Sequence, residues 1–322
     1  MEQALVERAG IPFKAIPAGG LHGVGIGRMA RNTLKLAAGM LKAWQLIGRH
    51  RPQAMLTTGG FVSAPVALAC WLRRVPILLY LPDIEPGLAV KFVARFASKI
   101  AVTTEESIRY FPAHKVIVTG YPTRAGFAQA DRLAAHRKFE LAEDRKTLLV
   151  FGGSKGARSI NRALVAVVEP LLMKYQIIHI SGSTDAGEVQ ARRAALPEEL
   201  KRHYHVFEYV HEMGLAFAAA DLVVSRAGAS ILGEYPLFGL SSILIPYPYA
   251  WRYQKVNADY LVAHGAALRL DDETLSETLQ PTIERLLSDE VQLSALSHAA
   301  QSLRRPDPAV KLAQTVQELA AV

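Results

Sequence analysis

The sequence predicts an α/β protein made of two doubly wound, parallel-sheet domains. Short apolar runs alternate with longer amphipathic segments along almost the whole chain. Strands that are separated by helix-length segments form right-handed βαβ units and a parallel sheet. The alternation occurs in two series with a polar stretch between them, and 322 residues are enough for two domains of about 150 residues each.

The first series contains the expected strands 14–18, 54–58, 76–80, 99–103 and 115–120, with amphipathic segments at 28–49 and 62–72. The second series contains the expected strands 147–153, 176–182, 205–210, 221–228, 241–248 and 266–270. The stretch between the two series is polar, and we place the linker near 122–128. The expected domains are therefore 1–125 and 126–304, and the amphipathic helix within 305–322 could pack back on the first.

The composition is that of a globular protein, with 50% hydrophobic residues. The single cysteine, Cys70, excludes an intrachain disulfide and fits a reducing compartment. The N-terminus has no secretory signal pattern, and no apolar run approaches the roughly 20 residues of a membrane span. A net charge of +8 suits phosphate or anionic lipid. We expect no nucleic-acid partner, because no RNA-binding signature with interleaved aromatic residues is present.

The segment FGGSKGARSIN, residues 151–161, joins an expected strand to an expected helix. Gly152, Gly153 and Gly156 allow a tight turn and a close backbone approach, and the helix start offers free N–H groups to a phosphate. Ser154 adds a hydroxyl donor. The spacing is not that of a P-loop, and an ordinary strand–helix turn remains the alternative.

Two later segments have the same strand–turn–helix form. In SRAGASILGE, residues 225–234, Gly228 marks a turn and Glu234 lies where a carboxylate could accept both hydroxyls of a ribose. In YPYAWRYQKVNA, residues 247–258, the polar residues Arg252, Gln254 and Asn257 suit sugar hydroxyls. The alternatives are a helix-surface acid, which first turns favour, and a solvated helix start.

Three segments of the first half are also candidates. TTGGFVSAP, residues 57–65, is another glycine turn at a strand end. Asp83 and Glu85 follow an apolar strand, where a general base or metal ligand could lie, although two acids beside prolines also describe an ordinary turn. Arg124 in GYPTR lies at the expected hinge.

In their order and spacing, these segments resemble the MurG-type enzymes of glycosyltransferase family 28. The resemblance covers the whole chain and rests on TTGGFVSAP, GYPTR, FGGSKGARSIN, EYVHEM, SRAGASILGE and RYQKVNA. Those enzymes transfer N-acetylglucosamine from UDP-N-acetylglucosamine (UDP-GlcNAc) to a lipid-linked muramyl-pentapeptide. The resemblance therefore implies a GT-B fold, in which two Rossmann-like domains face a cleft, and an inverting transfer that needs no metal and no cofactor.

The resemblance also implies roles for individual residues. Ser154 would contact the diphosphate, the backbone at Val210 would hold the uracil, Glu234 would bind the ribose, Gln254 would read sugar hydroxyls, and Arg124 would reach the donor from the hinge. The start of the helix beneath the diphosphate would be formed by Ala229, Ser230, Ile231, Leu232 and Gly233. A helix N-terminus can neutralise the leaving diphosphate in place of Mg²⁺.

The chain departs from the family pattern in two places. An HEQN-like segment of the family reads YLPD here, ending in Asp83, which moves the expected catalytic role to Asp83 or Glu85. The family also opens with a glycine-rich loop that ends in histidine, and this chain starts after it. His22 lies in a different loop. We therefore expect slow transfer by this chain.

Segment 28–49 combines Leu41 and Trp44 with basic residues, which suits peripheral binding to an anionic membrane; a helix packed on the core is the alternative. We expect a location on the cytoplasmic face of a bacterial inner membrane. Three other functions stay open: a diacylglycerol glycosyltransferase, a sugar-nucleotide epimerase of similar fold, and a truncated chain that binds UDP-sugar and membrane without catalysis.

Overall fold

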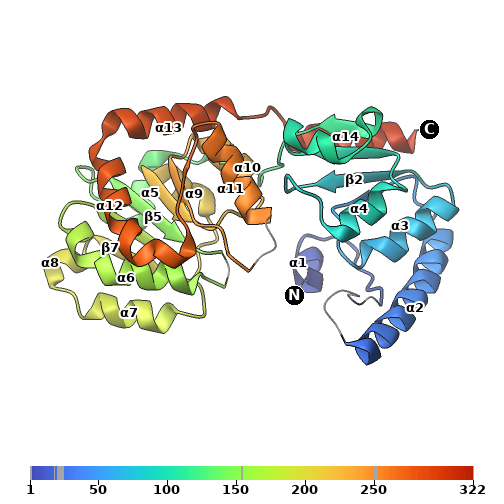
Figure 1. Ribbon diagram of the computed structural model, residues 1–322, viewed down its shortest axis with the longest axis horizontal. Helices are drawn as coiled ribbons and strands as arrows, with labels where there is room; N and C mark the ends of the chain where they lie inside the picture. The colour runs from blue at the N-terminus through green and yellow to red at the C-terminus, as the bar shows by residue number, and fades with distance from the viewer. Residues whose placement is uncertain (1, 18, 20–24, 154, 250–252, 322) are drawn as a thin grey trace. The chain divides into compact units, whose positions relative to one another are not determined.

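The protein is represented by a computed structural model that describes residues 2–17, 19, 25–153, 155–249 and 253–321. Contacts between residues divide the chain into two compact units, each with its own sheet (Figure 1). Unit 1 comprises Met1–Pro82, Pro86–Thr119 and Val310–Val322. Unit 2 comprises Asp83–Glu85 and Gly120–Ala309.

The sheet of unit 1 has four parallel strands that pair in chain order. They are β1 (Met55–Thr57), β2 (Ile77–Leu81), β3 (Lys99–Val102) and β4 (Val116–Val118). Successive side chains of a strand point to opposite faces. Ile77, Leu79 and Leu81 of β2 therefore pack against one helical layer, and Leu78 and Tyr80 against the other.

Helices cover both faces of this sheet. The first layer consists of α2 (Ile26–His50), α3 (Ser63–Leu72) and α4 (Leu88–Ala94). The second is α14 (Pro308–Ala320), whose Leu312 lies against β2, so the C-terminal helix belongs to unit 1. The remaining short elements are α1 (Glu2–Arg8) and the 3-10 turns η1 (Glu105–Tyr110) and η2 (Ala113–Lys115).

The expectation of a strand at 14–18 is wrong. Residues 14–17 form no strand, and residue 18 lies outside the described residues. Pro17 lies within the segment and Pro12 precedes it, and a proline has no N–H to donate to a sheet. Instead the segment lies along α2, where the carbonyl oxygen of Pro17 comes so close to Gly39 that a Cβ there would be 2.1 Å away.

The sheet of unit 2 has six parallel strands in the order β10-β9-β8-β5-β6-β7. They are β5 (Thr147–Phe151), β6 (Gln176–Ile180), β7 (Tyr204–Phe207), β8 (Leu222–Ser225), β9 (Ser242–Leu244) and β10 (Leu268–Arg269). The chain adds strands β6 and β7 on one side of β5 and strands β8, β9 and β10 on the other. This is the doubly wound arrangement, and the strand order reverses between β5 and β8. In such sheets, ligands bind outside the carboxyl ends of the strands at the reversal point.

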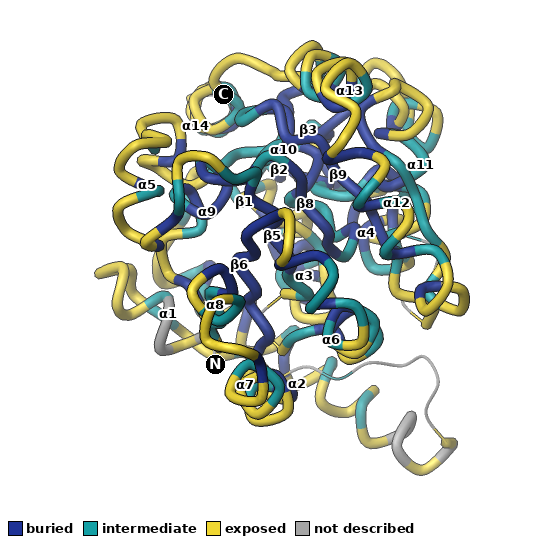
Figure 2. The backbone as a smooth tube through the Cα atoms, turned by 90° about the vertical axis from the view of Figure 1, so that its left-hand side faces the viewer, coloured by how far each residue is buried: buried dark blue, intermediate teal, exposed yellow. Residues whose placement is uncertain are grey.

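Two helical layers bury this sheet, whose strands β5 and β6 are dark blue in Figure 2. On one face lie α6 (Arg158–Leu172), α7 (Ala186–Ala194) and α12 (Leu275–Ser288). On the other lie α5 (Arg132–Phe139), α9 (Met213–Ala219), α10 (Ile231–Phe238) and α11 (Tyr253–Ala263). α13 (Glu290–Ser302) contributes to both cores, and α8 (Glu198–Lys201), η3 (Phe127–Gln129) and η4 (Asp272–Thr274) are short connections.

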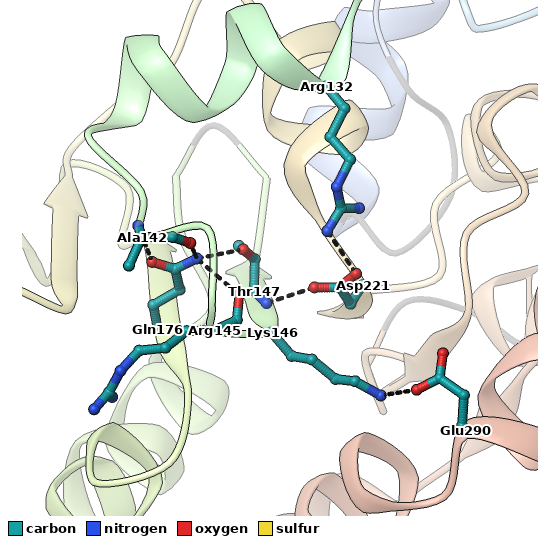
Figure 3. A network of polar contacts seen from close by, with 8 residues as sticks. All are labelled: Arg132, Ala142, Arg145, Lys146, Thr147, Gln176, Asp221 and Glu290. Carbon is teal, nitrogen blue, oxygen red and sulfur yellow. Dashed lines mark hydrogen bonds and ion pairs between the residues drawn. The ribbon is translucent and has the colours of Figure 1, made fainter.

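A polar network fastens the amino ends of the central strands (Figure 3). The fully buried Gln176 amide donates to the Thr147 hydroxyl at 3.0 Å and both donates to and accepts from the backbone of Ala142. The Asp221 carboxylate accepts from the Thr147 N–H at 2.6 Å and from Arg132 at 2.7 Å. These polar groups at the amino edge of the sheet bond to one another. A ligand site is expected at the opposite edge, where the strands have their carboxyl ends.

Within the described part of the chain, no helix combines the length and the apolar character needed to cross a membrane.

Candidate functional site in unit 2

The glycine turn after β5 starts at the reversal point of the sheet. Gly153 and Gly156 have φ angles of +90° and +81°, which L side chains rarely adopt, and a Cβ at Gly156 would lie 2.1 Å from the Ser181 carbonyl oxygen. Gly152 has no room for a side chain either, since its Cβ would lie 2.3 Å from the N of Ala157. All three predicted glycines are therefore required by the geometry, whereas Ser154 lies outside the described residues.

Helix α6 begins directly after this turn. Its N-cap, Ala157, makes no side-chain capping bond, so the first N–H groups of the helix have no side-chain cap there. Together with the positive end of the helix dipole, such groups favour an anion.

Buried polar side chains hold the turn in place. Asn161, on the first turns of α6, donates to the Ser181 carbonyl at 2.9 Å and to the Asp185 carboxylate at 2.8 Å. Its carbonyl oxygen lies 2.9 Å from Nε2 of His179, whose Nδ1 lies 2.7 Å from the Tyr204 hydroxyl. Burial lowers the pKa of His179 to about 3, so this ring is neutral and serves as a hydrogen-bonding group in the core.

The second glycine turn lies beside the first, because Phe151 pairs with Ser225 across β5 and β8. Ala229 and Ser230 form a turn ahead of α10, and the helix begins at Ile231, two residues later than expected. Gly228 has an ordinary φ, and a Cβ there would meet nothing within 4 Å. This glycine therefore leaves open space above the turn, which a bound group could occupy.

Other residues of the predicted helix start pack inward. Ile231 and Leu232 are buried in the core. Gly233 lies against Tyr121, whose Cβ would be 2.7 Å from a Cβ at position 233. This close approach brings the GYPTR segment, and with it Arg124, alongside the first turn of α10.

A cavity of about 270 Å³ opens between these elements of unit 2. Five predicted residues line it: Arg124, Gly153, Val210, Ser230 and Glu234. The rest of the lining is mostly apolar or aromatic: Tyr121, Pro122, Phe151, Ile180, Tyr209, Met213 and Phe217. An apolar hollow with a few convergent polar groups is the usual form of a small-molecule site.

Glu234 is the acid of this cavity. Burial raises the pKa of its carboxyl group, while the Ser230 hydroxyl bonded to it and the Arg124 guanidinium oppose the rise. Burial also raises the pKa of the Tyr121 phenol, and the charges of Glu234 and Asp83 add to that rise. The cavity thus places the Glu234 carboxylate, which can accept hydrogen bonds from hydroxyl groups, beside the positively charged Arg124.

Gln254 lies on a second hollow, of about 790 Å³, on the other side of the turn after β5. Gly152 and Gly156 line this hollow too, together with Arg226. The Gln254 side chain accepts from the Tyr247 N–H at 2.8 Å, and toward the described residues its amide N–H₂ group donates no hydrogen bond. The structure therefore separates Gln254 from the residues that line the first cavity.

Arg226 supports the loop that carries Tyr247. It donates to the Asp272 carboxylate at 2.5 Å, to the Ser159 hydroxyl at 2.8 Å and to the Ile245 carbonyl at 3.2 Å. Sequence reasoning did not identify Arg226, because an arginine directly after a strand has no distinctive pattern.

The candidate acids Asp83 and Glu85 belong to unit 2 by their contacts. Asn257 donates to the Asp83 carboxylate at 2.9 Å and to the Ala227 carbonyl at 3.2 Å, and it accepts from the Ile84 N–H at 3.2 Å. Burial raises the Asp83 pKa, and the bond from Asn257 opposes the rise.

These contacts correct the expectation for Asn257. Its side chain is fully buried and its three bonds are internal, so it cannot read sugar hydroxyls. Arg252 lies outside the described residues. Among the described residues, no cluster of three or more His, Cys, Asp or Glu could hold a metal ion.

Comparison with known proteins places this chain in a family. The model of the glycosyltransferase family 28 C-terminal domain matches residues 147–312, and that of the N-terminal domain matches residues 1–102. A relative from Roseiflexus sp. (strain RS-1) is 42% identical over 99% of this chain and 81% of its own length. One from Bacillus subtilis (strain 168) is 32% identical over 99% of this chain and 88% of its own length.

Both relatives are named UDP-N-acetylglucosamine--N-acetylmuramyl-(pentapeptide) pyrophosphoryl-undecaprenol N-acetylglucosamine transferase. In fold, the chain resembles the crystal structure of Acinetobacter baumannii MurG, with a TM-score of 0.77 at 22% identity over 99% of this chain and 88% of that one. It also resembles the S. aureus MnaA–UDP co-structure, with a TM-score of 0.68 at 12% identity over 97% of this chain and 84% of that one. The two sheets, the paired glycine turns and these relatives lead to one conclusion: the chain belongs to glycosyltransferase family 28.

Proposed function

We propose that the protein transfers N-acetylglucosamine from UDP-GlcNAc to muramyl-pentapeptide pyrophosphoryl-undecaprenol. The names of relatives at 42% and 32% identity support this reaction. The observation that carries the proposal is the cavity at the reversal point of the second sheet, where Glu234, Ser230 and Arg124 converge beside Gly153.

Each part of the UDP group has a suitable partner in this cavity or beside it. The diphosphate would lie over Gly153 and Gly228, ahead of α6 and α10, where the positive ends of the two helix dipoles favour negative charge. Glu234 would accept hydrogen bonds from the ribose hydroxyls. The uracil would lie along the apolar wall with its edge on the backbone of Val210.

The remaining donor contacts are also proposals. Arg124 would contact the donor from the start of unit 2, and Ser154, at the tip of the glycine turn, would contact the diphosphate. The amide N–H₂ group of Gln254, whose carbonyl oxygen accepts from Tyr247, would donate to a sugar hydroxyl. These contacts would hold the leaving diphosphate without a metal ion, because developing negative charge is stabilised by oriented N–H dipoles.

We assign the general base to Asp83, with Glu85 as the alternative. A base must remove a proton from the attacking hydroxyl, and burial raises the pKa of the Asp83 carboxyl, which makes its carboxylate a stronger base. Asp83 is also close enough to Tyr121, which lines the cavity, for its charge to affect that phenol. Direct attack on the anomeric carbon would invert its configuration.

We further propose a peripheral location on the cytoplasmic face of the inner membrane. Helix α2 packs on the core through Ala43 and Ile47, yet Leu34 and Leu41 are 72% and 67% exposed and Trp44 is 38% exposed. An exposed apolar face with basic neighbours suits the surface of an anionic bilayer.

The test is a transfer assay with labelled UDP-GlcNAc and a lipid-linked muramyl-pentapeptide analogue. Asp83→Asn should keep the hydrogen bond from Asn257 and lose only the base, so turnover should fall by about 10²–10⁴-fold while UDP affinity stays unchanged. Glu85→Gln is the matched comparison. Turnover with diacylglycerol but not with the muramyl lipid would refute the proposed acceptor, and a larger loss in Glu85→Gln would move the base to Glu85.

A further inference from the structure

A separate hollow of about 350 Å³ lies in unit 1, at the amino ends of β1 and β2. The C-terminal ends of three helices surround it. Arg51 is the C-cap of α2, Arg73 is the C-cap of α3, and Leu319 and Ala320 end α14. Arg74 also lines the hollow. None of the residues assigned above to the donor site takes part.

The hollow is rich in positive charge. Arg51, Arg73 and Arg74 all line it, and no acidic residue does. Across the described ranges, none of the three makes an ion pair. Nε of Arg73 is buried and has no hydrogen-bond partner, and the Arg73 guanidinium lies 3.9 Å from the centre of the Trp44 ring. A buried N–H without a partner is a costly exception in a folded protein.

Helix dipoles explain part of this charge. Arginines at helix C-termini offset the partial negative charge there, about half an elementary charge per helix. Three helix ends then supply about −1.5, against about +3 from three guanidinium groups. The surplus remains positive, so compensation of the dipoles alone does not account for the set.

Backbone geometry is a second, independent observation. Arg51 and Arg74 have φ angles of +44° and +58°. In this left-handed region a Cβ crowds the backbone, and glycine is the residue usually found there. Two strained positions on one hollow both carry arginine, and such strain tends to persist where the side chain has a role.

We propose that this hollow binds a phosphate-bearing anion, either a soluble pyrophosphate or the phosphodiester headgroup of a lipid. A guanidinium presents a planar fork of donors that matches phosphate oxygens, and three arginines line this hollow. The inference does not depend on the proposed transferase activity.

Trp44 supplies a local reporter, because the Arg73 guanidinium stacks on its ring. Pyrophosphate should change the tryptophan fluorescence, and Trp44→Phe should remove the response. Arg51→Gln and Arg74→Gln should each weaken the affinity roughly tenfold or more, the usual effect of losing a charged hydrogen bond. Arg49→Gln is the charge-matched control, since Arg49 is exposed near the same helix end and does not line the hollow.

The two sources of phosphate are separated by a second titration with phosphatidylglycerol vesicles, against phosphatidylcholine vesicles as blank. A response to free pyrophosphate assigns a soluble ligand, and a response to phosphatidylglycerol alone that Arg51→Gln and Arg74→Gln both weaken assigns a lipid headgroup. No response in either arm would overturn the proposal, as would an equal loss in Arg49→Gln.

Arg74→Gly distinguishes binding from a structural role. Glycine relieves the strain at φ +58°, so this variant should unfold at the same or a higher temperature while binding pyrophosphate at least tenfold more weakly. A lower unfolding temperature with unchanged binding would mean that Arg74 serves only the fold.

Discussion

Replacing Glu234 by glutamine tests the nucleotide site most directly. The substitution keeps the shape of the side chain and removes its charge in a cavity that also contains Arg124 and Ser230. If the carboxylate accepts hydrogen bonds from both ribose hydroxyls, Glu234→Gln should weaken UDP binding much more than the binding of 2′-deoxy-UDP.

The expected magnitude follows from the burial and charge of this group. Losing a hydrogen bond to a charged group costs about 1.5–3 kcal/mol, which corresponds to a roughly 10- to 150-fold loss in UDP affinity. Stability should change in the opposite direction. Burial raises the Glu234 pKa in the folded state, so ionised Glu234 disfavours folding at neutral pH, and this cost is relieved as the pH falls. The unliganded variant should therefore be as stable as the parent, or slightly more stable.

Isothermal titration calorimetry with UDP and 2′-deoxy-UDP measures the first effect, and thermal unfolding without ligand measures the second. Glu212→Gln is the matched control, because Glu212 is an exposed acid paired with Lys138 and does not line the cavity. Equal losses for both nucleotides would refute the ribose contact. A large loss of stability in Glu234→Gln would show that the carboxylate serves the fold instead.

Three further outcomes follow from the same structure. UDP affinity should decline on acidification at a pH above the ordinary glutamate value of 4.5, because the Glu234 pKa is raised; an affinity that is flat down to that pH in calorimetry would contradict this. Gly156→Ala should destabilise the protein and weaken UDP binding, because its Cβ would lie 2.1 Å from a backbone carbonyl oxygen, whereas Gly228→Ala, with open space around it, should leave the unfolding midpoint unchanged. Replacing Leu41 and Trp44 by serine should reduce sedimentation with anionic vesicles without unfolding the protein; a lower unfolding midpoint with unchanged sedimentation would refute the lipid contact.

Much of the fold could be predicted from the sequence because its strands are short, apolar and well separated. Ten of the eleven expected strand segments overlap a strand, for instance β5 inside 147–153 and β8 inside 221–228. The expected strand at 14–18 is wrong, because apolar content was weighed without the N–H donor that Pro17 removes from the segment. The pairing of β5 with β8 could not be predicted from the sequence either, since strand order depends on which way each helix crosses the sheet.

The site was predictable where glycine is required by backbone geometry. Gly153 and Gly156 have positive φ angles and were identified from their position after a strand. Polar side chains were harder to place. Gln254 and Asn257 lie three residues apart on α11, yet only Gln254 reaches a hollow, while Asn257 is fully buried. A sequence does not say which face of a polar helix start turns inward.

Asn257 connects the separate parts of the proposed reaction. Its amide bonds at once to the Asp83 carboxylate, to the Ile84 N–H and to the Ala227 carbonyl just ahead of the second glycine turn. A fully buried amide that satisfies three groups fixes their separation, because breaking any one bond leaves a buried polar atom unpaired. The segment with the proposed base is therefore held in register with the turn proposed to bind the leaving diphosphate. This arrangement keeps the two groups oriented before substrate arrives, which is the condition under which positioning lowers a reaction barrier.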